Sequence, residues 1–195
     1  NPGAMKGLRL RRPGEGGGDA EGLGEEQHRP GIVSSSGFEI GDTAVQIPAD
    51  FMITLHVVEE SDVGILLTKI NQRWGFGLMY DPVFYESLTM FILHEKFFNP
   101  ESFWKPFLDL LPEPEEMDNA LFWSAAELQL LSGSSVRQRI MVRRAEVRDN
   151  FNWLQQNVFR SYPEVFGERG PTEAQYRWAV AVVRRTAAAV KMVVI

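Results

Sequence analysis

The chain has 195 residues, of which 44% are hydrophobic and 24% charged, so it is long enough for one sizeable core. It has no cysteine, which excludes disulfides, a cysteine nucleophile and thiolate metal sites. The formal net charge of -6 argues against a general nucleic-acid binder, because a phosphate backbone is bound by clustered lysine and arginine. No apolar run approaches the roughly 20 residues of a membrane helix, so we expect a soluble intracellular protein without a membrane partner.

Residues 1–30 are rich in glycine and charge and contain almost no large apolar side chain. Such a segment cannot bury enough surface to offset the entropy lost on ordering, which predicts a disordered tail. Two short β-like segments follow, at residues 32–34 and 44–47, separated by turn residues and closed by Pro48. They predict a small hairpin within residues 31–60.

Beyond Asp62 the pattern becomes helical. Apolar residues recur at three and four positions after Pro82, which predicts a helix of about four turns over residues 82–98. A shorter aromatic helix is expected over residues 102–111. The next helix should begin at Ser124, where Glu127 completes a capping box, and end at Gly133.

A long helix is predicted over residues 135–158, with one apolar and one basic face. The apolar face consists of Val136, Ile140, Val147, Phe151, Leu154 and Val158. The basic face consists of Arg137, Arg139, Arg143, Arg144 and Arg148. We interpret these arginines as solvated or as paired within the chain. A last helix should open at Thr172, capped with Gln175, and residues 190–195 are typical of a buried strand.

None of the familiar catalytic patterns is present. The three histidines, His28, His56 and His94, are too scattered for a metal cluster, and the acidic residues at 113–116 lie in a loop without the burial that shifts a pKa. We therefore predict no metal ligand. The residue pattern alone indicates a mostly helical α+β domain that begins with a small β-structured segment.

Several short motifs are similar to one family of enzymes. They occur in this order: IP at 47–48, SFWKPF at 102–107, LLP at 110–112, FWS at 122–124, EL at 127–128, LSGS at 131–134 and YRWA at 176–179. This ordered set resembles the SET-domain protein methyltransferases of the Rubisco large-subunit and actin-histidine class. The similarity extends from about residue 31 to residue 195.

The resemblance implies an incomplete SET fold. Residues 31–60 would be N-terminal SET strands, residues 61–170 the helical SET-insert region, and residues 171–195 the final helix and strand that lead into the catalytic half. The family's Asn-His motif and its later tyrosine do not occur, so we expect no catalytic residue in this chain and no activity of the chain alone.

The resemblance also implies S-adenosylmethionine as cofactor. Gly31 falls on the second glycine of the family's Gly-x-Gly turn, so Gly31 and Ile32 are cofactor-binding candidates. The family's arginine near the end of the last helix aligns with Thr186, and Arg185 is the third candidate. Arg29 stands at the first glycine position, which together with Thr186 departs from the family pattern.

The family implies that the parent protein transfers methyl groups to a protein substrate, to lysine rather than histidine, in the cytoplasm, nucleus or plastid. The departures at Arg29 and Thr186 leave a second hypothesis open, a non-catalytic SET relative whose helical region binds proteins. A third hypothesis is a helical domain unrelated to SET, which requires the motif matches to be accidental.

Overall fold

The computed structural model describes residues 8–11, 31–34, 39–40, 43, 47–74 and 81–190. The chain divides into two compact units, residues 1–52 and residues 53–195. The first contains a two-stranded ladder and the 3-10 turn η1 (Ala49–Phe51), and the second contains the helices. We describe each unit by itself.

The α+β fold class predicted from the sequence is wrong. The described residues are predominantly helical, and the hairpin of SET strands expected within residues 31–60 is not seen among them. Strand β2 (Gly31–Ser34) instead pairs antiparallel with β1 (Leu8–Arg11), which comes from the segment expected to be disordered. Residues 44–46 of the expected second strand, and the strand expected at 191–195, lie outside the described residues.

Part of the predicted strand region is helical because Thr54 caps a helix. The hydroxyl of Thr54 accepts a hydrogen bond from the backbone N–H of Val57 at the start of α1 (Leu55–Glu60). Helix α2 (Asp62–Trp74) follows after a sharp corner at Ser61. Val58 of α1 is buried, so packing on the core holds this short helix despite the weak helix propensity of its valines.

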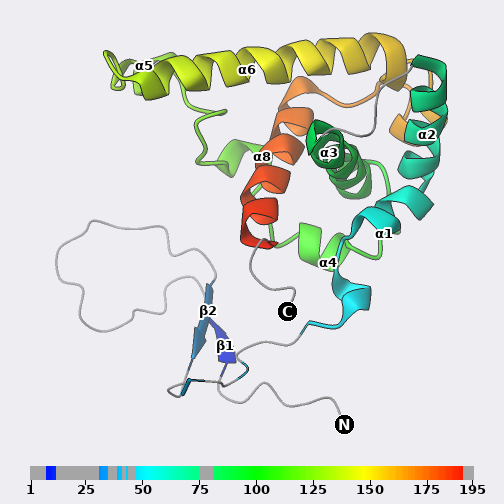
Figure 1. Ribbon diagram of the computed structural model, residues 1–195, viewed down its shortest axis with the longest axis horizontal. Helices are drawn as coiled ribbons and strands as arrows, with labels where there is room; N and C mark the ends of the chain where they lie inside the picture. The colour runs from blue at the N-terminus through cyan, green and yellow to red at the C-terminus, as the bar shows by residue number, and fades with distance from the viewer. Residues whose placement is uncertain are drawn as a thin grey trace. The chain divides into compact units, whose positions relative to one another are not determined.

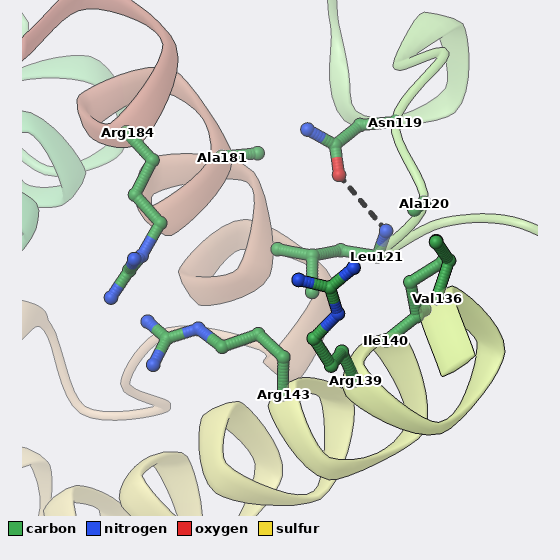
Figure 2. A pocket seen from close by; sticks show the side chains of 9 residues that line it. All are labelled: Asn119, Ala120, Leu121, Val136, Arg139, Ile140, Arg143, Ala181 and Arg184. Atoms are coloured by element: carbon green, nitrogen blue, oxygen red, sulfur yellow. Dashed lines mark hydrogen bonds between the residues drawn. The ribbon is translucent and has the colours of Figure 1, made fainter. Parts of the chain in front are cut away.

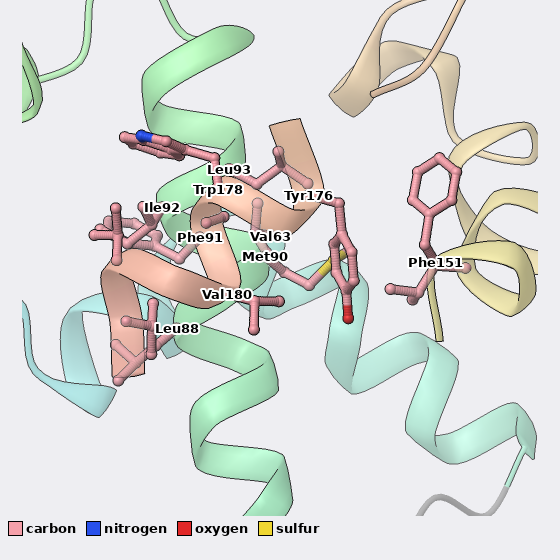
Figure 3. Packing of buried hydrophobic residues seen from close by; sticks show 14 of the residues in the cluster. Val63, Leu88, Met90, Phe91, Ile92, Leu93, Phe151, Tyr176, Trp178 and Val180 are labelled. Atoms are coloured by element: carbon pink, nitrogen blue, oxygen red, sulfur yellow. The ribbon is translucent and has the colours of Figure 1, made fainter. Parts of the chain in front are cut away.

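Helices α3 (Asp81–Phe97) and α8 (Glu173–Val190) form the centre of the helical unit, where they pack side by side (Figure 1). Residues 87–95 of α3 are all buried, as expected for a helix surrounded by others. The largest buried side chains of α8 are Tyr176 and Trp178, which interdigitate with Met90 and Leu93 of α3 (Figure 3). Both helices were predicted from the sequence, and both predictions are confirmed.

The segment between α3 and the next long helix consists of short elements. They are α4 (Lys105–Leu108), the 3-10 turn η2 (Pro114–Glu116) and α5 (Ala125–Gln129). Helix α4 is shorter than the helix predicted over 102–111. The capping box predicted for Ser124 and Glu127 is confirmed, and Gly133 ends this region with a φ of 84°, a conformation that glycine adopts without strain.

Helix α6 (Ser135–Leu154) continues into the π-helical turn η3 (Gln155–Phe159), and α7 (Pro163–Phe166) connects it to α8. The predicted apolar face is only partly buried. Val147, Phe151 and Leu154 lie in the core, whereas Val136 is 42% exposed. The N-terminal half of α6 therefore extends beyond the core, as the long yellow-green helix in Figure 1 shows.

Candidate functional site

A pocket of about 370 Å³ lies where the N-terminal half of α6 faces α8 and the loop at residues 119–121 (Figure 2). Val136 and Ile140 of α6 supply part of its apolar wall, together with Leu121 of the loop and Ala181 of α8. Arg139, Arg143 and Arg184 supply its charge, as the side chains in Figure 2 show. The pocket thus combines aliphatic walls with three guanidinium groups.

Two other arginines hold the loop wall in place. Arg144 of α6 donates to the backbone oxygen of Trp123 at 2.7 Å, and Arg177 of α8 donates to that of Leu121 at 3.4 Å. The backbone N–H of Leu121 donates in turn to the side-chain oxygen of Asn119 at 2.9 Å, the dashed line in Figure 2. Because the loop is tied to both helices, the shape of the pocket is preorganised.

The positive charge in the pocket is only partly compensated. Arg143 pairs with Glu146 at 2.9 Å, but its buried Nε atom has no hydrogen-bond partner among the described residues. Burial and the proximity of Arg143 lower the pKa of the Arg184 guanidinium, which lies 5.7 Å from the centre of the Tyr85 ring. The carboxylates of Glu146 and Glu86 oppose this lowering of the Arg184 pKa, so they compensate part of the positive charge.

Beneath these arginines, a carboxyl group of the core is paired with a tyrosine. The hydroxyl of Tyr176 donates to Glu86 at 2.7 Å. Burial raises the pKa of Glu86, while the Tyr176 hydrogen bond and the charges of Arg143 and Arg184 oppose the rise. Burial and the neighbouring Glu86 also raise the pKa of Tyr176, so this hydroxyl remains a proton donor at neutral pH.

We expect Glu86→Gln to stabilise the fold above neutral pH. The raised pKa means that the folded state takes up a proton more readily than the unfolded state, so ionised Glu86 costs stability at high pH and this cost disappears as the pH falls. The amide still accepts from Tyr176, and the gain at pH 8 should be on the order of 1 kcal/mol.

Urea denaturation of both proteins at pH 8 and pH 5 measures this effect. The advantage of the glutamine variant should shrink at the lower pH. A variant that is less stable than the wild type at pH 8 would show that the charges of Arg143 and Arg184 outweigh burial. Tyr176→Phe is the matched control, because it removes the donor and should destabilise the fold.

The motif SFWKPF begins with a buried polar cluster at the end of α3. Glu95 accepts hydrogen bonds from Ser102 at 2.5 Å and from Asn99 at 3.1 Å, and its other oxygen lies 3.0 Å from His94 Nδ1. Ser102 therefore contacts the carboxylate and not the imidazole, which is unlike a Ser-His nucleophile pair. These residues fix the chain as it leaves α3, and we assign them no catalysis.

The other motifs are joined by a tryptophan. The indole N–H of Trp178, in the motif YRWA, donates to the backbone oxygen of Pro112, in the motif LLP, at 2.7 Å. The Trp178 ring packs edge-on against Phe97 with centroids 5.3 Å apart. In the last helix, the predicted capping pair is confirmed, because Thr172 and Gln175 exchange hydrogen bonds of 2.8 and 3.2 Å. The residues behind the resemblance thus hold the fold together.

The three cofactor-binding candidates lie in separate elements. Gly31 and Ile32 belong to β2, where they pair with Arg11 and Leu10. Arg185 lies in the C-terminal part of α8, one residue beyond the pocket-lining Arg184. Because β2 and α8 belong to different units, the assignment of these residues to the cofactor stays a prediction.

The arginine pocket itself does not fit S-adenosylmethionine. The methyl donor carries a positive sulfonium beside its reacting carbon, and three guanidinium groups would repel it. We therefore do not assign the sulfonium of the methyl donor to this pocket.

Sequence analysis did not identify this pocket. It interpreted Val136 and Ile140 as core residues and the arginines as solvated or paired within the chain. Arg144 and Arg143 do have partners, at Trp123 and Glu146, but Arg139 and Arg143 also line the pocket. The spacing of Arg139 and Arg143, one helical turn apart, was the signal that could have indicated a shared site.

Within the described residues, no group of acidic and histidine side chains could hold a metal ion. None of the helices described is both long enough and apolar enough to span a membrane.

Comparison with known proteins gives a consistent set of relatives. The chain is 25% identical over 157 residues to the chloroplastic Rubisco large-subunit N-methyltransferase of Nicotiana tabacum, covering 80% of this chain and 29% of that enzyme. It is 24% identical to the chloroplastic fructose-bisphosphate aldolase-lysine N-methyltransferase of Arabidopsis thaliana, with the same coverage. It is 26% identical to the N-lysine methyltransferase setd6 of Danio rerio, covering 78% of this chain and 32% of that one.

Solved structures agree with these relatives. A structure of Rubisco LSMT bound to sinefungin and monomethyllysine matches with a TM-score of 0.69 and 21% identity, covering 93% of this chain and 36% of that one. The SET domain of LSMT bound to methyl-lysine and AdoHcy matches with a TM-score of 0.65 and 23% identity, covering 78% and 32%. No family model matches the chain.

The chain therefore has the fold of part of a SET domain. Its homologues are SET-domain lysine N-methyltransferases similar to the Rubisco large-subunit enzyme, and the resemblance found in the sequence is confirmed. The chain spans about a third of the length of these relatives.

Proposed function

We propose that this chain is part of an S-adenosylmethionine-dependent protein lysine N-methyltransferase, and that its helical unit is a scaffold on the protein-substrate side. The match to lysine methyltransferases over most of the chain carries this proposal. The names of the aldolase enzyme and of setd6 specify lysine, which favours lysine over histidine. The described motif residues are engaged in caps and packing, which is consistent with a scaffold role.

Radiolabelling tests the proposed activity. The protein in the full length that its gene encodes is incubated with S-adenosylmethionine tritiated in its methyl group and with total cell protein, and the labelled protein is hydrolysed to amino acids. We expect the label in methyl-lysine. Label found only in methyl-histidine would contradict the lysine specificity, and no label in either amino acid would contradict the activity.

We further propose that Gly31, Ile32 and Arg185 contact the cofactor in the full-length protein. Arg185→Ala should weaken the binding of S-adenosylmethionine about tenfold, which is the effect of losing one charge-assisted hydrogen bond. Calorimetric titration of the full-length protein measures the affinity. Arg160→Ala, at an exposed position after η3, is the control for the loss of a positive charge. Equal affinity of the Arg185 variant and the wild type would contradict the assignment.

The alternative function is a non-catalytic SET-like module that binds other proteins. Thr186 in α8 favours it, because the family places a cofactor-contacting arginine at this position. The two functions differ in cofactor binding. A full-length protein that binds neither S-adenosylmethionine nor sinefungin, and that transfers no label, would favour the binding module.

A further inference from the structure

We propose that the pocket defined by Arg139, Arg143 and Arg184 binds an extended acidic segment of the protein substrate, with carboxylates at alternate positions and a neighbouring apolar residue. This inference rests on the proposed function for the identity of the partner. The existence and the lining of the pocket do not depend on that function, because they follow from the structure of the chain.

Charge complementarity indicates a carboxylate ligand. Three arginines line the pocket, and of these Arg143 is paired with Glu146. Figure 2 shows the side chains of Arg143 and Arg184 approaching each other from opposite helices. A carboxylate placed between them would accept charge-assisted hydrogen bonds and relieve the repulsion between the two cations.

The spacing of the arginines fits an extended peptide. Arg139 and Arg143 are one turn apart on α6, a separation of roughly 6 Å along the helix axis. Alternate residues of an extended chain lie on the same side and are about 6.6 Å apart. Two acidic side chains separated by one residue can therefore reach both arginines at once.

The apolar wall provides the second part of the recognition. Val136, Ile140 and Leu121 lie beside the arginines, and Val136 is 42% exposed at the mouth of the pocket. A leucine next to the acidic pair would cover this surface. A nucleic acid is a poorer fit, because the chain carries a net charge of -6 and a phosphate backbone would leave the aliphatic wall of the pocket uncovered.

Fluorescence anisotropy with a defined probe tests the proposal. The probe is a labelled peptide of sequence Leu-Ser-Glu-Ser-Glu-Ser-Leu with blocked ends. In either direction it presents a leucine two positions from the nearer glutamate, on the same side of the extended chain. The wild-type chain should bind this probe at least about tenfold more tightly than a peptide with glutamine in place of both glutamates. Equal binding of the two peptides would overturn the proposal.

Matched variants of α6 show whether the pocket is the binding site. Arg139→Gln should weaken binding of the acidic peptide about tenfold. Arg148→Gln removes the same charge from the same helix at a position 61% exposed and outside the pocket, and it should leave the affinity within about twofold of the wild type. Equal losses in the two variants would mean non-specific attraction and would overturn the proposal, as would complete displacement of the peptide by equimolar inorganic phosphate.

The outcomes also separate this inference from the proposed function. Peptide binding that depends on Arg139, in a protein that yields no methyl-lysine, would reject the methyltransferase and leave the pocket assigned. Methyl-lysine formation without peptide binding would reject the peptide-binding role of the pocket and would support the methyltransferase activity.

Discussion

Replacing Trp178 by alanine should lower the free energy of unfolding of the chain by about 4 kcal/mol, the typical cost of truncating a fully buried tryptophan. Its side chain is completely buried in α8, and its indole N–H donates to Pro112. The substitution leaves a cavity against Phe97 and an unpaired carbonyl at Pro112, two residues before η2, so the loss should extend beyond α8.

Guanidinium denaturation followed by circular dichroism measures this effect. Trp178→Phe separates the two contributions, because it keeps most of the packing and removes the hydrogen bond, at a cost of about 2 kcal/mol. Leu110→Ala is the matched control, since Leu110 is 69% exposed and its loss should cost less than about 0.5 kcal/mol. If Trp178→Ala stays within 1 kcal/mol of the wild type, the central position of α8 in the fold is wrong.

Gly64→Ala should destabilise the chain by about 3 kcal/mol, because the corner between α1 and α2 has no room for a methyl group. A Cβ atom at Gly64 would overlap the backbone oxygen of Val58 and lie 2.6 Å from the Cα of Glu59. Ser61 fixes this corner, since its hydroxyl donates to Val58 at 2.6 Å and accepts from the Gly64 N–H at 3.1 Å. The alanine variant must therefore separate the two helices.

The neighbouring Ile65 provides the control for this prediction. Its side chain is 48% exposed, and Ile65→Ala should cost less than about 1 kcal/mol. Thermal unfolding of the two variants beside the wild type gives the comparison. Equal melting temperatures for Gly64→Ala and Ile65→Ala would contradict the tight corner.

The helices that sequence analysis predicted are those with local signals. Capping residues mark the starts of α5 and α8, at Ser124 and Thr172, and three-to-four periodicity marks α3 and α6. Such signals depend on residues within a few positions of each other, so they are readable without the tertiary structure. Helix α1 was missed because it has only six residues and depends on the burial of Val58 in a core built by distant helices.

The pocket could not be predicted for a related reason. Val136 and Val147 occupy the same face of α6, but only Val147 reaches the core. The difference depends on where α8 ends its contact with α6 and on the loop at residues 119–121, which is held by Arg144 and Arg177 through non-local hydrogen bonds. Helical periodicity identifies the face of a helix, but not how much of its length is covered.

The most direct test of the account is a pair of titrations of the 195-residue chain. If its helical unit is a substrate-side scaffold, the chain should bind the acidic leucine-containing peptide and lose that binding on Arg139→Gln. It should bind sinefungin at least about a hundredfold more weakly than the full-length protein does, because the resemblance places part of the cofactor site in the family's Asn-His motif and later tyrosine, which do not occur in these 195 residues. Stoichiometric binding of sinefungin to the chain, without binding of the acidic peptide, would contradict the account.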